Sequence, residues 1–226
     1  WVLAAVVYAG VREPVRPAVE ADDDGAPGWV QASWQLLRDD RPFRHFVLAR
    51  TLLLVSALSP PFVVALAAGV GGVGLGGLGP FVIAQGLASL IGGKPFGTLA
   101  DRSSRKLMTW GAGIASATVV LFLVALAVPG LGGQWWLYPA VYLLLVLVHT
   151  AVRVARKTYV VDMAEGDQRT VYVAVANTIM GVLLLAIGAL SGALAALGAE
   201  IALGFLALLG LLGVLVSRSL PEVSRR

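Results

Sequence analysis

The chain has 226 residues, of which 58% are hydrophobic and only 13% charged, and its formal net charge is +4. Soluble domains carry about 25% charged residues, so this composition indicates a membrane protein. The absence of cysteine excludes disulfides, thiol catalysis and thiolate metal sites. The basic residues lie in short segments between apolar runs, which argues against a nucleic-acid partner and for control of membrane topology.

The first 45 residues differ from the rest of the chain. Residues 1–11 are apolar without a basic flank before them, so we interpret them as the end of a truncated transmembrane helix. We therefore expect the N-terminal half of the protein, which would precede this helix end, to be missing from the chain. Residues 12–45 combine Pro and Gly with the acidic run at 22–24, as expected for a polar central linker. The second half of this linker, residues 29–44, fits either an amphipathic helix on the membrane surface or a plain tether.

Six apolar segments follow, each close to the roughly 20 residues that cross a bilayer core. Because lipid offers no hydrogen bonds to the backbone, each segment should be a helix. We therefore predict an all-α, polytopic membrane bundle of six transmembrane helices at 46–217, with a tail at 218–226. The segments are Phe46–Val70, Pro80–Ala100, Leu107–Val128, Trp135–Ala155, Val171–Leu197 and Ile201–Val216.

Small residues and prolines interrupt these segments. Glycines four residues apart, as in the pairs Gly93/Gly97 and Gly188/Gly192, predict close helix packing or interfaces that can slide. Prolines at 60 and 61, directly after Ser59, predict a kink in the first segment. That kink fits either a helix break beside a cavity or a bend that follows neighbouring helices.

The distribution of Lys and Arg predicts the topology. All 17 lie at 12–50, 94–106, 153–169 or 218–226, whereas the alternate connections at 71–79 and 129–134 carry no charge. By the positive-inside rule the linker, the charged connections and the C-terminus should be cytoplasmic. We expect an integral protein of the bacterial cytoplasmic (plasma) membrane.

Polar side chains within the apolar segments are candidates for an interior cavity, because polar groups in lipid-spanning helices tend to face the bundle interior or water. His149 fits either a proton relay or a histidine satisfied at the membrane interface. No Asp or Glu occurs in mid-segment, so a coupling carboxylate is not expected in this chain. The cavity candidates are Ser56, Ser59, Gln85, Ser89, Tyr142, His149, Thr150, Asn177 and Thr178.

No enzyme motif is present in the sequence. H-E-x-x-H, G-x-S-x-G and the Walker loop are all absent, and the two histidines, His45 and His149, have no ligand spacing. We therefore expect no catalytic residues, no metal site and no cofactor.

The most specific motif is the charged loop from Gly97 to Lys106, with the pattern G-x-L-A-D-R-x-x-R-K. It resembles the signature loop of the major facilitator superfamily, in which Gly usually stands at the place of Ser104. Its position after a linker resembles the second copy of that loop, so 46–217 would correspond to the C-terminal six-helix half. A second charged segment is similar to the family's connection between the tenth and eleventh helices, through Arg153, Arg156, Asp162 and Arg169.

The resemblance implies a secondary active transporter that moves a small-molecule solute by rocking-bundle alternating access, coupled to a proton or ion gradient or driven by the solute's own gradient. A permease and an efflux protein both fit, and the alternative is a non-transporting membrane sensor or assembly subunit on the same fold. The gating residues would be Gly97, Asp101, Arg102, Arg105 and Lys106.

In the family the acid at the position of Asp101 faces a helix N-terminus of the opposite half. Arg105 and Lys106 would bind Asp162 or Glu165, or would serve topology and contact anionic lipid.

Overall fold

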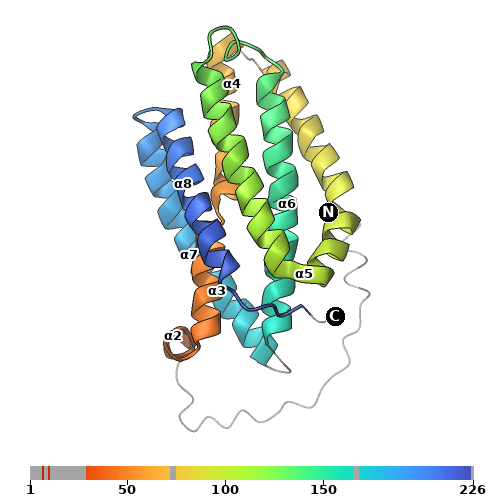
Figure 1. Ribbon diagram of the computed structural model, residues 1–226, viewed down its shortest axis with the longest axis vertical. Coiled ribbons are helices and arrows are strands. Elements are labelled where there is room, and N and C mark those ends of the chain that lie inside the picture. The colour runs from red at the N-terminus through yellow and green to blue at the C-terminus, as the bar shows by residue number, and fades with distance from the viewer. Residues whose placement is uncertain (1–6, 8–9, 11–28, 72–74, 165–167, 225–226) are drawn as a thin grey trace. The chain divides into compact units, whose positions relative to one another are not determined.

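The computed structural model describes Val7, Gly10 and residues 29–71, 75–164 and 168–224. Within these residues every regular element is a helix, so the all-α prediction is confirmed. The predicted helix end at 1–11 falls almost entirely outside the described residues, as does the linker up to residue 28. The elements are α2 (Trp29–Asp39), α3 (Arg41–Leu52), α4 (Val55–Gly71), η1 (Leu75–Leu78), α5 (Gly79–Ala127), α6 (Leu137–Met163), α7 (Gln168–Ala195) and α8 (Ala199–Arg218) (Figure 1).

Five of the described helical stretches are long and apolar enough to cross a membrane: Arg41–Val70, α5, α6, α7 and α8. This agrees with the expected integral membrane protein, although six apolar segments were predicted. The difference lies in α5, which contains both the second and the third predicted segments.

Helix α5 has 49 residues, which is about 73 Å at the rise of an α-helix and more than twice the bilayer core. It does not run straight, because Ser103 has an extended backbone (φ −166°, ψ 95°). The Ser103 Oγ accepts a hydrogen bond from the Lys106 N–H at 3.2 Å, as an N-cap does for the helix that follows. Figure 1 shows both arms of α5 rising from this bend, on either side of α6.

The first span is also interrupted, but not at its prolines. Helix α3 ends at Leu52 and α4 begins at Val55, and Pro60 and Pro61 lie inside α4. The Asp40 side chain caps α3 by accepting a hydrogen bond from the Phe43 N–H at 2.9 Å. The break therefore precedes the predicted kink by about two turns.

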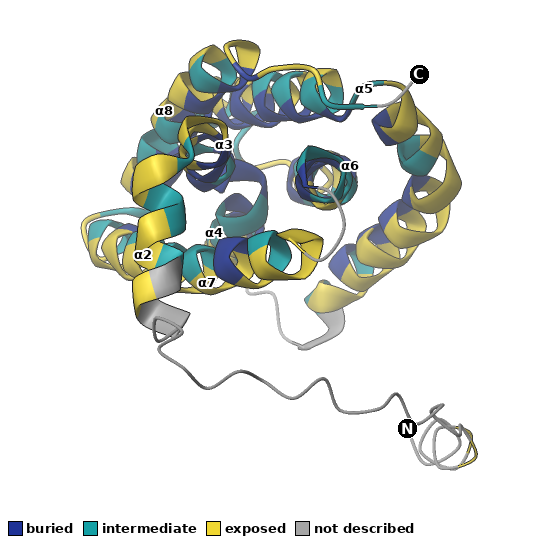
Figure 2. Ribbon diagram, turned by 90° about the horizontal axis from the view of Figure 1, so that it is seen from below, coloured by how far each residue is buried: buried dark blue, intermediate teal, exposed yellow. Residues whose placement is uncertain are grey.

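The core of the bundle lies around α6, which packs against both arms of α5 and against α4 (Figure 2). Tyr159 stacks on Phe46 of α3 with ring centroids 5.0 Å apart, and Tyr138 meets Phe122 of α5 edge-on at 5.5 Å. Such aromatic contacts join α6 to two different helices at its two ends.

Close helix packing occurs at other glycines than those predicted. A Cβ at Gly93, Gly97 or Gly192 would have no neighbouring atom within 4 Å, and one at Gly188 would only touch Leu58 at 4.0 Å. A Cβ on Gly111 would instead lie 2.5 Å from a Val152 methyl carbon, and one on Gly210 of α8 would lie 2.2 Å from the Ser116 Oγ. Within the described residues the predicted glycine pairs therefore form no close helix contact, since an added Cβ would meet no atom nearer than 4.0 Å.

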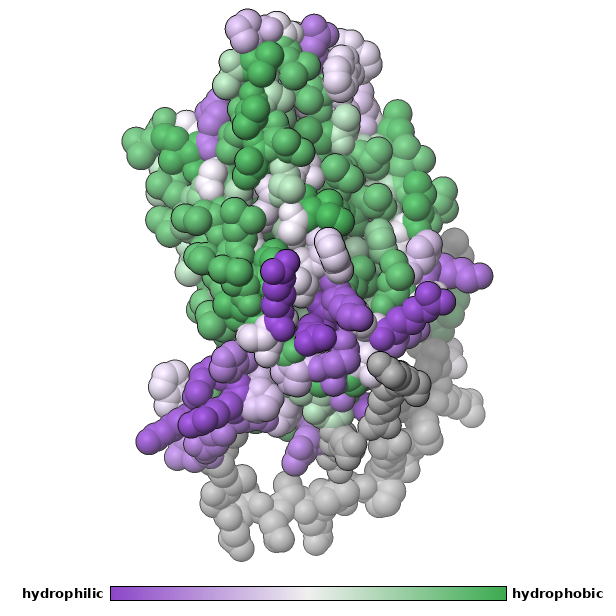
Figure 3. All heavy atoms as spheres, viewed as in Figure 1, coloured by the Kyte–Doolittle hydropathy of each residue, from purple (hydrophilic) through white to green (hydrophobic). Residues whose placement is uncertain are grey.

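The outer surface of the bundle is apolar. Leu90, Leu121 and Leu185 are 82%, 68% and 76% exposed, as suits side chains that face lipid. Figure 3 shows that hydrophilic side chains gather at the end of the bundle where α5 bends and the chain ends. The structure thus brings the charged connections predicted to share one side to the same end of the bundle.

Candidate functional site

An open cavity of about 440 Å³ lies among α4, α5 and α6. It combines an apolar wall with a few polar groups, which is typical of sites for small molecules. Helix α4 supplies one wall, α6 supplies the opposite wall, and α5 supplies a single residue. The lining residues are Ser56, Ala57, Pro60, Pro61, Val64, Gln85, Tyr142, Val146 and His149.

Two polar contacts connect the walls of this cavity. The Tyr142 hydroxyl of α6 donates a hydrogen bond to Oε1 of Gln85 on α5 at 3.3 Å, and Phe81 packs edge-on against the Tyr142 ring. The Ser56 Oγ of α4 lies 3.5 Å from Nδ1 of His149 on α6. Both contacts are long, so the same groups are available to a bound solute.

The two prolines add backbone acceptors to the cavity. Proline has no N–H, so Pro60 and Pro61 cannot donate the helical hydrogen bonds to the carbonyls of Ser56 and Ala57. All four residues line the cavity. The prolines thus lie beside a cavity but inside α4, whereas the break in this span lies at Leu53 and Leu54, about two turns before the predicted kink.

The structure brings together four of the predicted cavity residues and separates the other five. Of these five, Thr150 is buried with its hydroxyl donating to the Val146 carbonyl at 3.0 Å, and Thr178 is exposed outside the cavity lining. Ser56, Gln85, Tyr142 and His149 line the cavity. Ser89 lies one turn from Gln85, and its hydroxyl donates to the Gln85 carbonyl at 2.9 Å. Ser59 is completely buried and its hydroxyl has no hydrogen-bond partner among the described residues.

Asn177 belongs to a different polar contact. Its Oδ1 accepts a hydrogen bond from Arg50 Nη2 at 2.9 Å, which connects α7 to α3. Asn177 therefore does not line the cavity between α4, α5 and α6, and its side chain instead contacts an arginine outside that lining.

The charged loop Gly97–Lys106 forms the bend of α5, where the extended backbone of Ser103 separates the two helical arms. Asp101 and Arg102 are exposed, and neither forms a hydrogen bond or ion pair with a described residue. A Cβ added at Gly97 would have no neighbouring atom within 4 Å. The contact predicted for Asp101 with another half of the protein thus stays a prediction.

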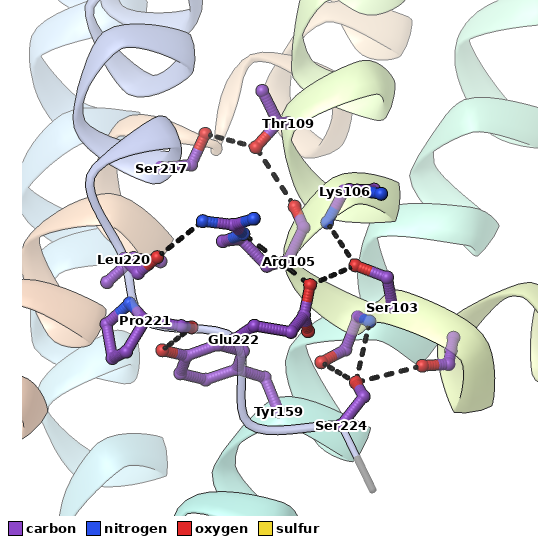
Figure 4. A network of polar contacts seen from close by, with 12 residues as sticks. Ser103, Arg105, Lys106, Thr109, Tyr159, Ser217, Leu220, Pro221, Glu222 and Ser224 are labelled. Carbon is purple, nitrogen blue, oxygen red and sulfur yellow. Dashed lines mark hydrogen bonds and ion pairs between the residues drawn. The ribbon is translucent and has the colours of Figure 1, made fainter. Parts of the chain in front are cut away.

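The C-terminal residues 219–224, here called the C-terminal strap, bind to this bend (Figure 4). Arg105 donates from Nη1 to the Leu220 carbonyl at 3.1 Å, and its Nε lies 3.6 Å from Oε2 of Glu222. The Ser103 hydroxyl donates to the same Glu222 oxygen. Arg105 was expected to bind Asp162 or Glu165, but its recorded ion pair is with Glu222, and Glu165 lies outside the described residues.

The strap also accepts hydrogen bonds from the start of the second arm of α5 and from the end of α6. The Ser104 N–H donates to the Ser224 Oγ at 2.9 Å, and the Tyr159 hydroxyl donates to the Pro221 carbonyl at 3.0 Å. Glu222 therefore places a carboxylate at a helix N-terminus, where the helix dipole favours negative charge. The sequence pattern had indicated Asp101 for a carboxylate at a helix N-terminus and gave no indication of Glu222.

A signal for the strap is nevertheless present in the sequence. Leu220 follows the last helix directly and is 1% exposed, while Pro221 prevents the helix from continuing. A large apolar residue next to a proline in an otherwise polar tail is typical of a segment that packs back on its own protein.

The second charged segment does not form a single cluster. Arg153 is exposed, Arg156 is buried, and Asp162 is half-buried. The exposed Arg169 donates from Nε to the Ala164 carbonyl at 3.3 Å. Arg156 is the unusual member, since a charged side chain rarely lies inside an apolar bundle.

No protein-family model matches the chain, and no curated protein matches its sequence. Within the part of the chain that the structure describes, no group of three or more His, Asp or Glu side chains could hold a metal ion. The resemblance of the charged loop to the major facilitator superfamily therefore stays a prediction from its motif.

Proposed function

We propose that the protein is a secondary active transporter that moves a small solute through the cavity between α4, α5 and α6. The observation that carries this proposal is an open cavity with polar groups inside a bundle whose outer surface is apolar. A lipid-facing bundle gains nothing from polar side chains in its interior unless they have partners or a ligand.

The broken span next to the cavity supports a moving helix. The interruption at Leu53 and Leu54 separates α3 from α4, and the prolines of α4 weaken its backbone hydrogen bonding where it faces the cavity. Alternating access requires helices that change their angle around a fixed site, and discontinuous helices are common at such sites.

In this proposal each arm of α5 crosses the membrane, so the bundle has six spans of the kind found in a half of a major facilitator transporter. The arms are each about 24 residues long, or about 36 Å, which suits a bilayer core of about 30 Å. The bend at Ser103, the strap and the other basic connections would face the cytoplasm. Rocking of this half against a second one would open the cavity to either side.

Transport assays with the intact protein in proteoliposomes test the proposal. We expect uptake or efflux of at least one member of a panel of small solutes, with or without a proton gradient. The variants Tyr142→Phe and Gln85→Ala should reduce transport, because each removes one side of the contact that connects α5 with α6 across the cavity. Ser191→Ala on α7 is the control, since the Ser191 hydroxyl donates to the Ile187 carbonyl of its own helix at 2.7 Å and does not line the cavity.

Two results would contradict transport. The first is no solute flux under any gradient by well-folded protein, which would favour a sensor or assembly subunit. The second is equal flux by Tyr142→Phe, Gln85→Ala and the control.

A further inference from the structure

Arg156 of α6 is 7% exposed, and neither its Nε nor its Nη1 has a hydrogen-bond partner among the described residues. Arg50 of α3 has one such atom, because its Nε is also buried without a hydrogen-bond partner among the described residues. Three buried guanidinium nitrogens from two helices thus have no acceptor within the part of the chain that the structure describes. Neither the cavity nor the strap uses them.

The charges around Arg156 make its position less favourable still. The guanidinium groups of Arg50 and Arg153 are close enough to repel its charge, and Arg153 and Arg156 in turn act on His149. His149, Arg153 and Arg156 follow one another at helical spacings of four and three residues, so they share one face of α6. That face continues from the cavity, which Tyr142 and His149 line.

A buried cation without a partner is costly. Burial removes the hydration of the charge, and only hydrogen-bonded pairing with an opposite charge compensates for that loss. Native proteins rarely leave such donors unsatisfied, and an unplaced water or ion is the usual explanation. A water molecule can accept the hydrogen bonds, but it leaves the positive charge of the cluster unbalanced.

The geometry points to an oxyanion, and we propose that Arg156 and Arg50 together bind a phosphate group. Guanidinium groups match phosphate oxygens with paired hydrogen bonds, and they keep their charge when buried. The three arginines suit a group that carries up to two negative charges. Asn177 holds one end of Arg50 at 2.9 Å and so orients it, while its buried Nε is available to the ligand.

The phosphate group has two sources that share this chemistry: a free phosphate or phosphorylated solute, and the headgroup of an anionic lipid. A solute would reach Arg156 along the α6 face from the cavity, about 10.5 Å for the seven residues from His149. A lipid would reach it from the membrane beside Asn177, which is exposed. The site itself does not depend on transport, so it stands or falls separately from the proposed function.

Ligand-dependent stability of the purified intact protein tests the site. The protein is placed in nanodiscs of phosphatidylcholine, and its thermal unfolding midpoint is followed while inorganic phosphate is titrated. A second series replaces part of the phosphatidylcholine with phosphatidylglycerol at zero phosphate. A saturable rise with inorganic phosphate indicates the soluble source, and a rise only with phosphatidylglycerol indicates the lipid source.

Arg156→Gln should weaken the observed affinity by about tenfold or more, since it removes a charged donor from the ligand. Arg50→Gln should do the same and provides a second reading if Arg156→Gln does not fold. Arg102→Gln is the control, because it removes the same charge from an exposed side chain without recorded contacts. Without ligand, Arg156→Gln should unfold at or above the wild-type temperature, because it relieves an unpaired buried charge.

The proposal is overturned if neither phosphate nor phosphatidylglycerol stabilises the wild type. It is also overturned if Arg156→Gln, Arg50→Gln and Arg102→Gln all respond to the ligand as the wild type does, since the effect would then be a general response to ionic strength or surface charge.

Discussion

Gly210→Ala is the most direct test of how the bundle packs. Gly210 lies on α8 where this helix approaches both α4 and the second arm of α5. An added Cβ would lie 2.2 Å from the Ser116 Oγ and 2.6 Å from Cγ1 of Val55. Both distances are too short for a Cβ, so α8 would have to move outward or both neighbours would have to change rotamer.

The expected cost follows from these two contacts. Inserting a methyl group into a well-packed core costs about 1–3 kcal/mol. Ala stabilises a helix by up to about 1 kcal/mol relative to Gly, and less where the helix persists in lipid after tertiary contacts are lost. We therefore expect Gly210→Ala to lower the free energy of unfolding by about 1–2 kcal/mol.

Gly192→Ala on α7 is the matched control, because no atom lies within 4 Å of the position of its Cβ. Only the helix preference acts there, so its unfolding free energy should stay the same or rise by less than about 1 kcal/mol. The two variants make the same chemical change, yet only Gly210→Ala should lower the free energy of unfolding. Denaturant titration in detergent micelles, followed by tryptophan fluorescence, measures both.

A third variant tests the cause of the loss. Ser116→Ala removes the nearer of the two clashing atoms, and its hydroxyl has no hydrogen-bond partner to lose among the described residues. In the Gly210→Ala background it should recover part of the lost stability, while the contact with Val55 remains. The packing argument is refuted if Gly210→Ala is as stable as the wild type, or if Ser116→Ala worsens it.

Three further results are expected. Asp101→Asn should insert normally yet transport less, and unchanged transport at equal surface expression would exclude its predicted contact with another half. Glu222→Gln should lower the free energy of unfolding by only about 0.2–1 kcal/mol, because its ion pair with Arg105 is partly exposed. It should nevertheless speed amide hydrogen exchange in the C-terminal strap. Unchanged exchange would show that Glu222 does not hold the strap. Because the chain has no cysteine, the single substitutions Gly133→Cys and Lys157→Cys can report the membrane topology. Membrane-impermeant thiol reagents should label the two cysteines from opposite sides, with Lys157→Cys on the cytoplasmic side. Labelling from the same side would contradict the positive-inside prediction.

Much of the fold could be predicted because it depends on local properties of the chain. Long apolar segments must form helices in lipid, since their backbone groups have no other hydrogen-bond partners. The polar residues of the cavity were also recognisable, because polar side chains within an apolar segment tend to face the bundle interior or a water-filled cavity. Gln85 and Tyr142 accordingly meet in the structure.

The division of the helices was less predictable. A ten-residue charged loop was expected between two helices, whereas a single extended residue, Ser103, separates the two helical arms of α5. The backbone angle at one residue depends on what its neighbours contact, and here the strap supplies those contacts from more than 100 residues away.

The sequence by itself therefore determined that the chain forms apolar helices of the kind found in membrane proteins. It also determined which segments are apolar and where the charged residues are concentrated. Only the tertiary structure decided how residues of the same type differ in their surroundings. Gly210 is tightly packed and Gly192 is open, and Arg156 is buried while Arg153, three residues earlier on the same helix, is exposed. The reason is physical: helix formation follows from each segment's own composition, whereas burial and pairing depend on the distances and angles at which separate helices meet.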